Sequence, residues 1–471
     1  MKVLVIGLDC APPREVFHRF RGSLPNISRL MEEGAWGELE STIPPITTPA
    51  WMAMATSANP GRLNCFGFRN RRKGTYLEME IANSRTIPEP TIWDRLSREG
   101  RRVVLLGVPQ TYPPKPVNGL MVTSFLAPDT DSDYTYPPEL KEEIRDVVGD
   151  YMIDCRNFRT EEKTHLLDQI HQMTRMRFDL AEHFLKTKPW DYFQMVEMGT
   201  DRIHHAFWKH YDTEHRKHEK GNPFERAIPD YYVYVDERIG RLLELIDRKE
   251  TAVFIVSDHG AKKMDGAICV NDFLIREGFM TLRSKPQGVV RIEEADIDWS
   301  KTTAWGFGGY YSRVYLNVRG REKHGIVSPE EYSEVRERLK KALESIPDER
   351  GHPLPTTAFI PEDVYTGDYV ANAPDLLVHF GDLHWRASQD IGHDSIYSFE
   401  TEIGPDDAMH SQHGIFVMAN GTVSGGEELE RLRIYDVAPT VYRLLGMEPP
   451  DGLEGKVIDK SGGSGRKEEI A

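Results

Sequence analysis

The stretch "TAVFIVSDHG", residues 251 to 260, is a continuous run of apolar, largely β-branched residues that ends in two ionisable side chains. Such a run is typical of a strand that is buried on both faces, as in a parallel sheet covered by helices. Asp258 and His259 follow the run directly, and Gly260 comes next. Ligands of open α/β sheets bind beyond the carboxyl ends of the strands, so these two side chains lie where a functional site is expected.

Similar apolar runs recur along the chain and alternate with helical patterns. They are "KVLVIGLD" (2–9), "RRVVLLGVP" (101–109), "YFQMVEM" (192–198), "PDLLVHF" (374–380) and "HGIFVMA" (413–419). Apolar residues at helical spacing predict helices over 229–247 and 328–346, the second opened by Ser328 as cap and Pro329 in the first turn. The pattern predicts an α/β fold with a mostly parallel central sheet flanked by helices, the sheet including all six runs.

We expect one catalytic domain over residues 1–458. Two segments depart from the strand–helix rhythm, at about 126–190 and 284–350, and we interpret both as insertions that build a cap or rim over the sheet. Residues 459–471 include "SGGSGRKEEIA", whose composition is typical of a flexible tail.

The composition excludes several classes of function. Of the 471 residues, 39% are hydrophobic and 28% are charged, which is typical of a soluble globular protein. A net charge of -16 argues against a surface that binds nucleic acid or an anionic membrane. No apolar run of 18 residues occurs, and "MKVLVIGLDC" is too quickly polar for a signal peptide. The four cysteines lack CxxC spacing, which favours a reducing compartment without a thiol metal site, so we expect a cytoplasmic protein.

Carboxylates and imidazoles gather at the ends of four of the predicted strands. They are Asp9, then Asp201 and His205 in "GTDRIHH", then Asp258 and His259, and finally His410 and His413 in "HSQHGIF". Any one of them alone could cap a turn or face solvent. Together they predict a site for divalent metal at one edge of the sheet, and their number exceeds what one tetrahedral ion binds, so two ions are implied.

The stretch "STIPPITTPAWMAMATS" (41–57) offers a nucleophile for such a site. Pro49 suits the first turn of a helix, and Thr48 is a natural N-cap for it. Alternatively, Thr47 or Thr48 is a nucleophile at a helix N-terminus, where N–H groups and the helix dipole favour an anion such as phosphate. The residues alone leave both interpretations open.

The ordered set of motifs resembles the alkaline phosphatase superfamily, in its type I phosphodiesterase / nucleotide pyrophosphatase branch. It is most similar to the prokaryotic phosphohydrolase or phosphomutase proteins of that superfamily. The motifs are "VIGLD", "ITTPAWMAMATSANPGRLNCFGF", "GTDRIHH", "VSDHG", "HSQHGIF" and "YDVAPTVYRLLGMEPPDGLEGKVI", which together span almost the whole chain.

The resemblance implies a role for each site residue. Family members place the nucleophile two residues before a proline, which selects Thr47 and leaves Thr48 as the cap. One metal is then held by Asp9, Thr47, Asp258 and His259, and the other by Asp201, His205 and a late histidine. Spacing to the last strand favours His410 for that ligand, with His413 as the alternative.

The resemblance also implies an asparagine, some twenty residues after the nucleophile, that stabilises the phosphoryl oxygens. In "NCFGFRNRRK" the candidates are Asn64 and Asn70, of which we prefer Asn70, and Arg69 could act as a clamp. The same stretch is also typical of a solvated basic turn.

These observations predict a two-metal phosphohydrolase that cleaves a phosphate mono- or diester of a small molecule through a covalent phosphothreonine on Thr47. Zinc is the expected ion, with manganese the alternative. A phosphomutase would use the same residues, and an inactive binding protein would share the fold. A sulfatase is disfavoured because no cysteine or serine precedes the proline, and "VIGLDCAPP" lacks the G-x-G-x-x-G turn of a nicotinamide-binding protein.

Overall fold

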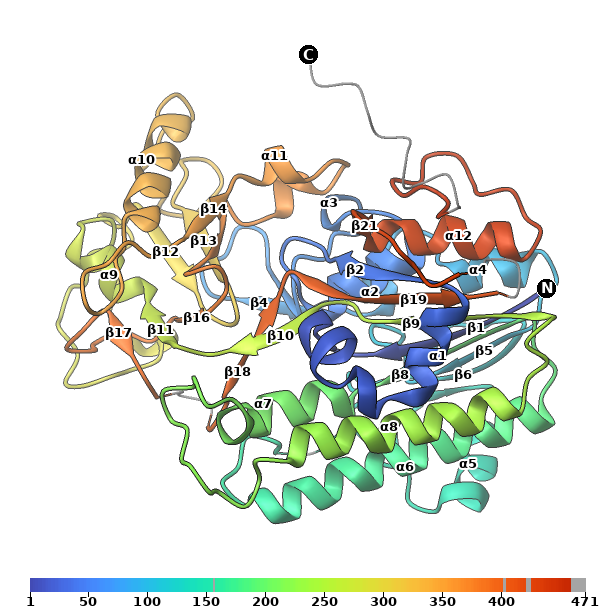
Figure 1. The fold of residues 1–471 in the computed structure, drawn as a ribbon. Helices are drawn as coiled ribbons and strands as arrows, with labels where there is room; N and C mark the ends of the chain where they lie inside the picture. Colours follow the sequence, from blue (N-terminus) through green and yellow to red (C-terminus); the bar gives the residue numbers. More distant parts are fainter. Residues whose placement is uncertain (156, 401–403, 421–424, 459–471) are drawn as a thin grey trace.

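A computed structural model describes residues 1–155, 157–400, 404–420 and 425–458. Its largest element is a ten-stranded sheet with the order β20-β2-β19-β9-β1-β8-β5-β6-β7, in which β21 also pairs with β2 (Figure 1). The strands are β1 (Lys2–Leu8), β2 (Ala35–Glu40), β5 (Val103–Leu106), β6 (Gly119–Val122), β7 (Thr135–Tyr136), β8 (Tyr192–Glu197), β9 (Thr251–Val256), β19 (His413–Ala419), β20 (Glu427–Glu428) and β21 (Leu432–Arg433).

Strand β1 lies between β8 and β9 and runs parallel to both. Its register pairs Leu8 with Glu197 and Gly7 with Val256, so all three strands end at the same level of the sheet. Strand β19 is antiparallel to β9 and to β2. The expected mostly parallel sheet is therefore confirmed, and the residues that follow β1, β8 and β9 share one edge.

Helices cover both faces of this sheet (Figure 1). One face carries α1 (Pro25–Glu33), α5 (Leu140–Val148), α6 (Lys163–Thr187), α7 (Gly199–Tyr211) and α8 (Ala227–Glu244). The other carries α2 (Thr47–Thr56), α3 (Pro60–Leu63), α4 (Ile92–Arg98) and α12 (Val437–Leu444). The apolar stripe expected over 229–247 is the buried face of α8, with Val235, Ile239 and Leu242 fully buried. None of the helices in the described ranges is both long and apolar enough to cross a membrane.

Residues 266–396, which we call the second lobe, have an apolar core of their own. They form two further sheets and three α-helices. These elements lie beside the main sheet (Figure 1). The elements are β11 (Gly266–Cys269), β12 (Ala304–Phe307), β13 (Ser312–Leu316), β14 (Thr357–Phe359), β15 (Leu376–His379), β16 (Trp385–Ser388), α9 (Val270–Arg276), α10 (Tyr332–Glu344) and α11 (Pro361–Val364); β17 (Tyr397–Ser398) adds to the sheet of β11 and β16.

Two small antiparallel pairs complete the structure. One is a hairpin of β3 (Arg69–Arg71) and β4 (Met79–Ile81). The other is the ribbon of β10 (Gly260–Lys263) and β18 (Ala408–Ser411), which runs from the edge of the main sheet toward the second lobe (Figure 1).

Two local predictions are wrong. The run 374–380 forms β15 of the second lobe rather than a strand of the main sheet, because an apolar run can be buried in either of two separate cores. The helix expected from Ser328 begins at Tyr332, with Glu331 as its N-cap residue. Ser328 Oγ instead accepts a hydrogen bond from the Glu331 N–H at 3.3 Å, in a turn before the helix.

The segments interpreted as insertions have different surroundings. Within 126–190, α6 contacts β5 and β8 and forms part of the helical layer, whereas 284–350 supplies β12, β13 and α10 of the second lobe. The single-domain limits remain a prediction, and the expected tail at 459–471 lies outside the described residues.

Candidate metal centre and active site

The carboxyl edge of the main sheet positions the first group of side chains. Asp9 comes directly after β1, and its backbone N–H continues the ladder by donating to the Glu197 carbonyl at 3.1 Å. Asp258 and His259 come after β9, and the Asp258 carboxylate accepts a hydrogen bond from the Cys10 N–H at 3.2 Å. The three side chains of Asp9, Asp258 and His259 are fully buried, and they form a group of donors close enough to bind one ion.

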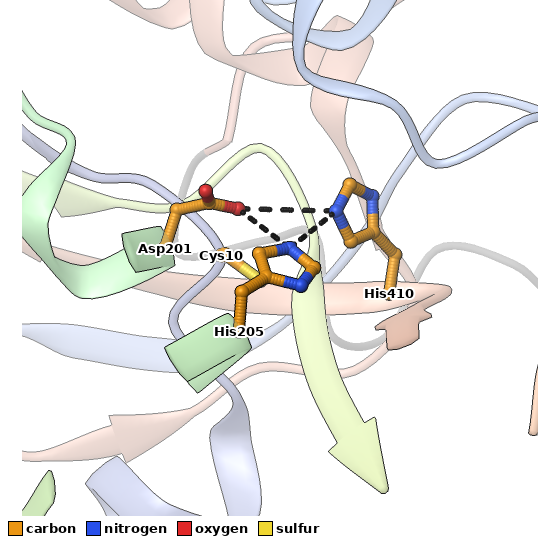
Figure 2. A group of neighbouring side chains, drawn as sticks. All are labelled: Cys10, Asp201, His205 and His410. Carbon is orange, nitrogen blue, oxygen red and sulfur yellow. Dashed lines mark hydrogen bonds and ion pairs between the residues drawn. The ribbon is translucent and has the colours of Figure 1, made fainter. Parts of the chain in front are cut away.

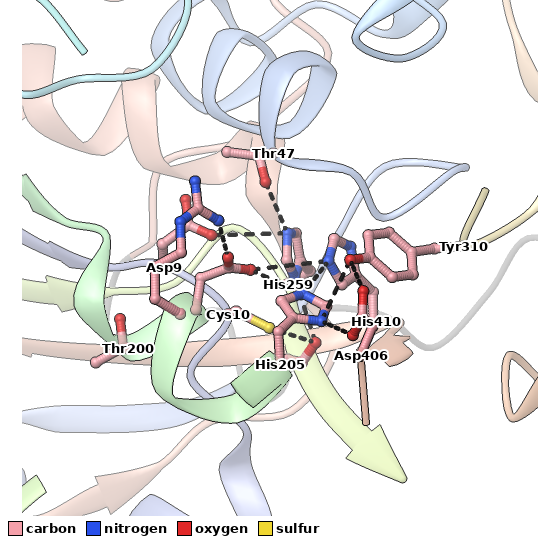
Figure 3. Close-up of polar contacts among 12 residues, drawn as sticks. Asp9, Cys10, Thr47, Thr200, His205, His259, Tyr310, Asp406 and His410 are labelled. Carbon is pink, nitrogen blue, oxygen red and sulfur yellow. Dashed lines mark hydrogen bonds and ion pairs between the residues drawn. The ribbon is translucent and has the colours of Figure 1, made fainter. Parts of the chain in front are cut away.

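Thr47 completes this first group from the other side (Figure 3). Its Oγ1 lies 3.3 Å from His259 Nε2, which in turn lies 3.1 Å from Asp258 Oδ2 and 3.9 Å from Asp9 Oδ1. Separations near 3 to 4 Å are those expected between ligand atoms that each lie about 2 Å from one metal ion.

The second group consists of Asp201, His205 and His410, with Cys10 beside them (Figure 2). Asp201 and His205 are one turn apart on α7, and His205 Nε2 lies 3.2 Å from Asp201 Oδ1. His410 Nε2 lies 3.3 Å from His205 Nε2 and 3.8 Å from Asp201 Oδ1. Although the sequence predicts no thiol in the site, the Cys10 sulfur belongs to this group of possible donors.

The β10–β18 ribbon explains how a residue so late in the chain reaches this group. His410 pairs with Ala261, two residues after His259, and the two imidazole rings stack with centroids 3.8 Å apart. His410 is buried, and its Nδ1 contacts the Pro45 carbonyl at 2.8 Å. His413 instead is exposed at the start of β19, so the structure brings His410 and not His413 into the site.

Electrostatics in the site favour bound cations. Burial, together with the nearby Asp258 and Asp201 carboxylates, raises the pKa of Asp9 well above its usual value. Asp9 Oδ1 and Asp258 Oδ2 are buried and find no hydrogen-bond partner among the described residues. Buried carboxylate oxygens that accept no hydrogen bond are costly, and a divalent cation would satisfy both. The donor set therefore fits the ions that the sequence predicts.

The charges around Asp201 are different. Burial alone would raise the pKa of Asp201, but His205 and Arg202 outweigh it and hold that pKa well below its usual value. Arg202 contacts the Asp201 carboxylate directly and also pairs with Asp154, with Nη2 at 2.7 Å from Oδ2. Asp201 is thus held as a carboxylate by protein cations before any metal is considered.

A second layer of residues orients His205 (Figure 3). Its Nδ1 lies 2.8 Å from Asp406 Oδ1, and Asp406 Oδ2 accepts hydrogen bonds from Tyr310 Oη at 2.9 Å and Arg159 Nε at 3.0 Å. Burial disfavours the charged imidazolium, yet Asp406 and Asp201 outweigh it and raise the pKa of His205 to about 9. A carboxylate bound to one ring nitrogen leaves the other free to bind a metal.

The start of α2 distinguishes the two threonines. The helix begins at Thr47, with Ile46 as the N-cap residue and no side-chain cap. The prediction that Thr48 caps the helix is therefore wrong, because the helix starts one residue before it. Thr48 Oγ1 is buried and has no hydrogen-bond partner among the described residues, whereas Thr47 Oγ1 faces His259.

Comparison with known proteins gives a consistent assignment. The family model of the type I phosphodiesterase / nucleotide pyrophosphatase matches residues 3–415. The chain belongs to this family. It is accordingly a metal-dependent phosphoric ester hydrolase of the alkaline phosphatase superfamily. The comparison with curated proteins gives no match.

Several solved structures of low sequence identity share the fold. Human ectonucleotide pyrophosphatase / phosphodiesterase 5 is 14% identical, with 96% of each chain covered and a TM-score of 0.54. Phosphonoacetate hydrolase from Sinorhizobium meliloti 1021, in complex with phosphonoformate, is 15% identical with a TM-score of 0.59, over 94% of this chain and 96% of that one. An inactive threonine-to-alanine variant of the murine phosphodiesterase 5, in complex with AMP, is 12% identical with a TM-score of 0.53, over 96% of each chain.

Asn70 of this phosphodiesterase-family chain occupies a structural position in β3. Its side-chain amide donates to the Asn64 carbonyl at 2.7 Å and accepts from the Phe66 N–H at 3.2 Å, which closes the loop between them. The alternative Asn64 accepts a hydrogen bond from Asn372, and Arg69 is exposed. A role for Asn70 in binding phosphoryl oxygens remains a prediction.

Sequence reasoning missed several residues that shape the site. They include Cys10, Trp51, Arg159, Arg202, Tyr310 and Asp406. Trp51 Nε1 donates a hydrogen bond to Asp9 Oδ2 at 2.7 Å. Trp51 is one helical turn after Thr47 in the sequence, and this spacing could have indicated that its side chain lies near the site. The "PDDAMH" motif before His410 was a signal for Asp406. Arg159 and Tyr310 come from distant segments with no motif, so only the fold reveals them.

Proposed function

We propose that the chain is a two-metal phosphohydrolase that cleaves a small-molecule phosphate mono- or diester through a covalent phosphothreonine on Thr47. One observation carries the proposal: a threonine hydroxyl at the start of α2 lies 3.3 Å from His259 Nε2, within a buried set of carboxylates and imidazoles. Family membership supports phosphoester hydrolysis in general.

The proposed ligands divide into two sets. Asp9, Asp258, His259 and the Thr47 oxygen would hold one ion, and Asp201, His205 and His410 the other. Donors of carboxylate and imidazole type suit zinc, with manganese as the alternative. When bound, such ions supply positive charge that stabilises the negative oxygens of the transition state and favours the ionised hydroxyl of the nucleophile.

The chain's own groups carry the bond changes. Thr47 Oγ1 attacks phosphorus in line, the bond from phosphorus to the leaving oxygen breaks, and the threonine proton is lost to the surroundings. The leaving group takes up a proton as it departs. In the second step a water oxygen attacks the same phosphorus from the opposite side, the Thr47–phosphorus bond breaks, and a proton from the water restores the Thr47 hydroxyl. The product is phosphate from a monoester, or a phosphate monoester from a diester.

The helix N-terminus supports the phosphoryl group. The amides of Thr47 and Thr48 belong to the first turn of α2, where N–H groups have no acceptor within the helix. Both therefore suit an anion close to the nucleophile. We propose a further contribution from Asn70, which requires its amide to leave the hydrogen bonds that it makes with Asn64 and Phe66.

Two alternatives use the same residues. In a phosphomutase a second hydroxyl of the substrate replaces water in the second step. In an inactive binding protein the phosphoryl group binds without transfer. Two of the structural neighbours were solved with a ligand, one with AMP and the other with phosphonoformate, so we propose that the substrate is a small phosphorylated or phosphonylated compound. A cytoplasmic location remains part of this proposal.

A metal and substrate assay tests the function. The purified chain, loaded with Zn²⁺ or Mn²⁺, is supplied with p-nitrophenyl phosphate and with bis(p-nitrophenyl) phosphate, and the bound metal is counted. We expect two ions per active site and release of p-nitrophenol from at least one of the esters. Two or more bound ions per chain without hydrolysis of either ester would favour the mutase or binding alternatives, and fewer than two ions would contradict the ligand assignment.

A further inference from the structure

The second lobe contains another group of metal-ligating side chains, far from Thr47 in the fold. Cys269, Asp272 and His393 each offer one donor atom, and the three atoms lie within 4.8 Å of one another. Cysteine, carboxylate and imidazole together are a donor set that zinc prefers, and calcium or magnesium does not. None of the three belongs to the active-site groups described above.

The local structure holds the three donors in place. His393 Nδ1 lies 2.9 Å from Asp272 Oδ2, and the same carboxylate accepts hydrogen bonds from the N–H groups of Gly392 at 2.9 Å and His393 at 3.2 Å. Cys269 is the last residue of β11, and Asp272 is in the first turn of α9, which follows it immediately. The junction between β11 and α9 thus positions Cys269 and Asp272. The loop that contains His393 is hydrogen-bonded to Asp272 and positions the third ligand.

Solvent reaches the group from one side. Cys269 is fully buried, whereas Asp272 and His393 are half-buried and line an open groove of about 830 Å³ together with Met280, Ile391 and Tyr397. Three protein ligands on the inner side therefore leave the outer side open to a water molecule, which would complete a tetrahedral ion.

We propose that Cys269, Asp272 and His393 form a third metal site, which binds Zn²⁺ and fixes the loop around residue 393 to the β11–α9 junction. On binding, the Cys269 thiol loses its proton to solvent. The His393 imidazole stays neutral and carries its proton on Nε2, so that Nδ1 binds the ion. The thiolate and the carboxylate together neutralise the charge of the dication, and the loop is tied to a distant part of the chain.

Metal counting on the full chain tests this site, with inductively coupled plasma mass spectrometry after dialysis against Zn²⁺. We expect three ions per chain in the wild type and two in His393→Ala, with hydrolysis unchanged. His352→Ala is the matched control, because His352 is also in the second lobe and also contacts an aspartate, Asp348, at 3.2 Å, but without a cysteine donor. The His352→Ala control should still bind three metal ions per chain.

Co²⁺ substitution provides a second readout that does not depend on activity. The wild-type chain should show a thiolate-to-cobalt charge-transfer absorption that is smaller in Cys269→Ser, so the difference between their spectra isolates this site from any contribution of Cys10. Equal numbers of bound ions in the wild type and His393→Ala, or identical cobalt spectra for the wild type and Cys269→Ser, would each overturn the proposal. None of these results depends on whether Thr47 is a nucleophile.

Discussion

Asp406 orients a proposed metal ligand, His205, and is not itself one of the proposed ligands. It contacts the ring nitrogen of His205 that faces away from Asp201, while Tyr310 and Arg159 occupy its other oxygen. A carboxylate in this place fixes the tautomer of a metal-binding histidine and raises its basicity. Asp406 thus acts through His205.

Asp406→Asn should weaken binding of one of the two active-site ions about 10- to 100-fold and leave the other unchanged, because only His205 loses its orienting carboxylate. A titration against a competing chelator measures both affinities. Asp407→Asn is the control, since the Asp407 carboxylate is directed toward Lys209 at 3.8 Å instead of His205. Equal affinities in Asp406→Asn and the wild type would contradict this role.

Glu15 gives a prediction about pH. Burial raises the pKa of Glu15 to about 7, although Arg19 opposes the shift. The folded chain therefore binds this proton more tightly than the unfolded chain does. The stabilising contribution is complete below about pH 4.5 and is lost as the pH rises through about 7, with a total on the order of 3 kcal/mol.

Glu15→Gln removes this titration, so its Tm relative to the wild type should rise between pH 4.5 and pH 8. Differential scanning calorimetry at the two pH values measures the change. Glu38→Gln, at an exposed position on β2, should show no such trend. A Tm difference for Glu15→Gln that stays constant with pH would refute the assignment.

Much of the candidate site could be predicted at the residue scale, because several of its residues are close together in the sequence. Asp201 and His205 are one helical turn apart, and Asp258 and His259 directly follow an apolar strand, so local rules bring them to one place. The resemblance selected Thr47 and His410. Tyr310 and Arg159 were not predictable, because no local pattern says that their segments meet at Asp406.

Among the elements, the β10–β18 ribbon links the two metal groups. It begins directly after His259 and carries His410 on the opposite strand. Gly260 permits this close approach, because a Cβ there would lie 2.3 Å from the His413 carbonyl oxygen and 2.4 Å from Ser411 Oγ. The ribbon thus fixes the distance between the His259 and His410 rings.

Gly260→Ala should push the two strands apart and lower kcat/KM by at least about tenfold, since displacement of ligands by an ångström is enough to disturb catalysis on that scale. Steady-state kinetics and metal counting measure the effect. Lys263→Ala, on the same strand with its side chain directed to Asp265, should retain near wild-type activity. Unchanged kinetics in Gly260→Ala would show that the ribbon tolerates the spacing change.

The elements also show where sequence prediction stops. The runs that became β1, β8 and β9 were predictable because their apolar residues are continuous and are followed by polar ones. The run at β15 looks the same in sequence, yet it pairs with β13 and β14 in the second lobe. An apolar pattern shows that a strand is buried but not which core it joins. The start of α10 at Tyr332 likewise shows that the first residue of a helix depends on local contacts that the pattern does not reveal.

At the scale of the whole molecule, the active site lies where two cores meet. Asp9, Asp201 and Asp258 project from the edge of the main sheet, whereas Tyr310 belongs to the second lobe and contacts Asp406 across the junction. Burial, together with the nearby Asp258 and Asp201 carboxylates, raises the pKa of Asp9, so the ionised form of Asp9 is disfavoured in the protein without bound ions. Bound ions should therefore stabilise the entire chain.

Removal of the metals by a chelator should abolish hydrolysis and lower the Tm, and added Zn²⁺ should restore both. Ligand linkage gives a stabilisation of about 4 kcal/mol for each site at a free ion concentration about 1,000 times Kd. Thermal unfolding with and without chelator measures the difference. Asp201→Ala, which removes a ligand of one ion, should show a smaller response, and an equal Tm for metal-free and metal-loaded wild type would contradict the proposed centre.

The central claim is that Thr47 becomes phosphorylated during turnover. Brief incubation with substrate, an acid quench and peptide mass spectrometry should locate phosphate on Thr47 in the wild type. Thr47→Ala should give no phosphopeptide and should lower kcat by about 10³-fold or more, with its metal largely retained, while Thr47→Ser should keep measurable turnover. Phosphate on Thr48, or near wild-type hydrolysis by Thr47→Ala, would show that another residue is the nucleophile.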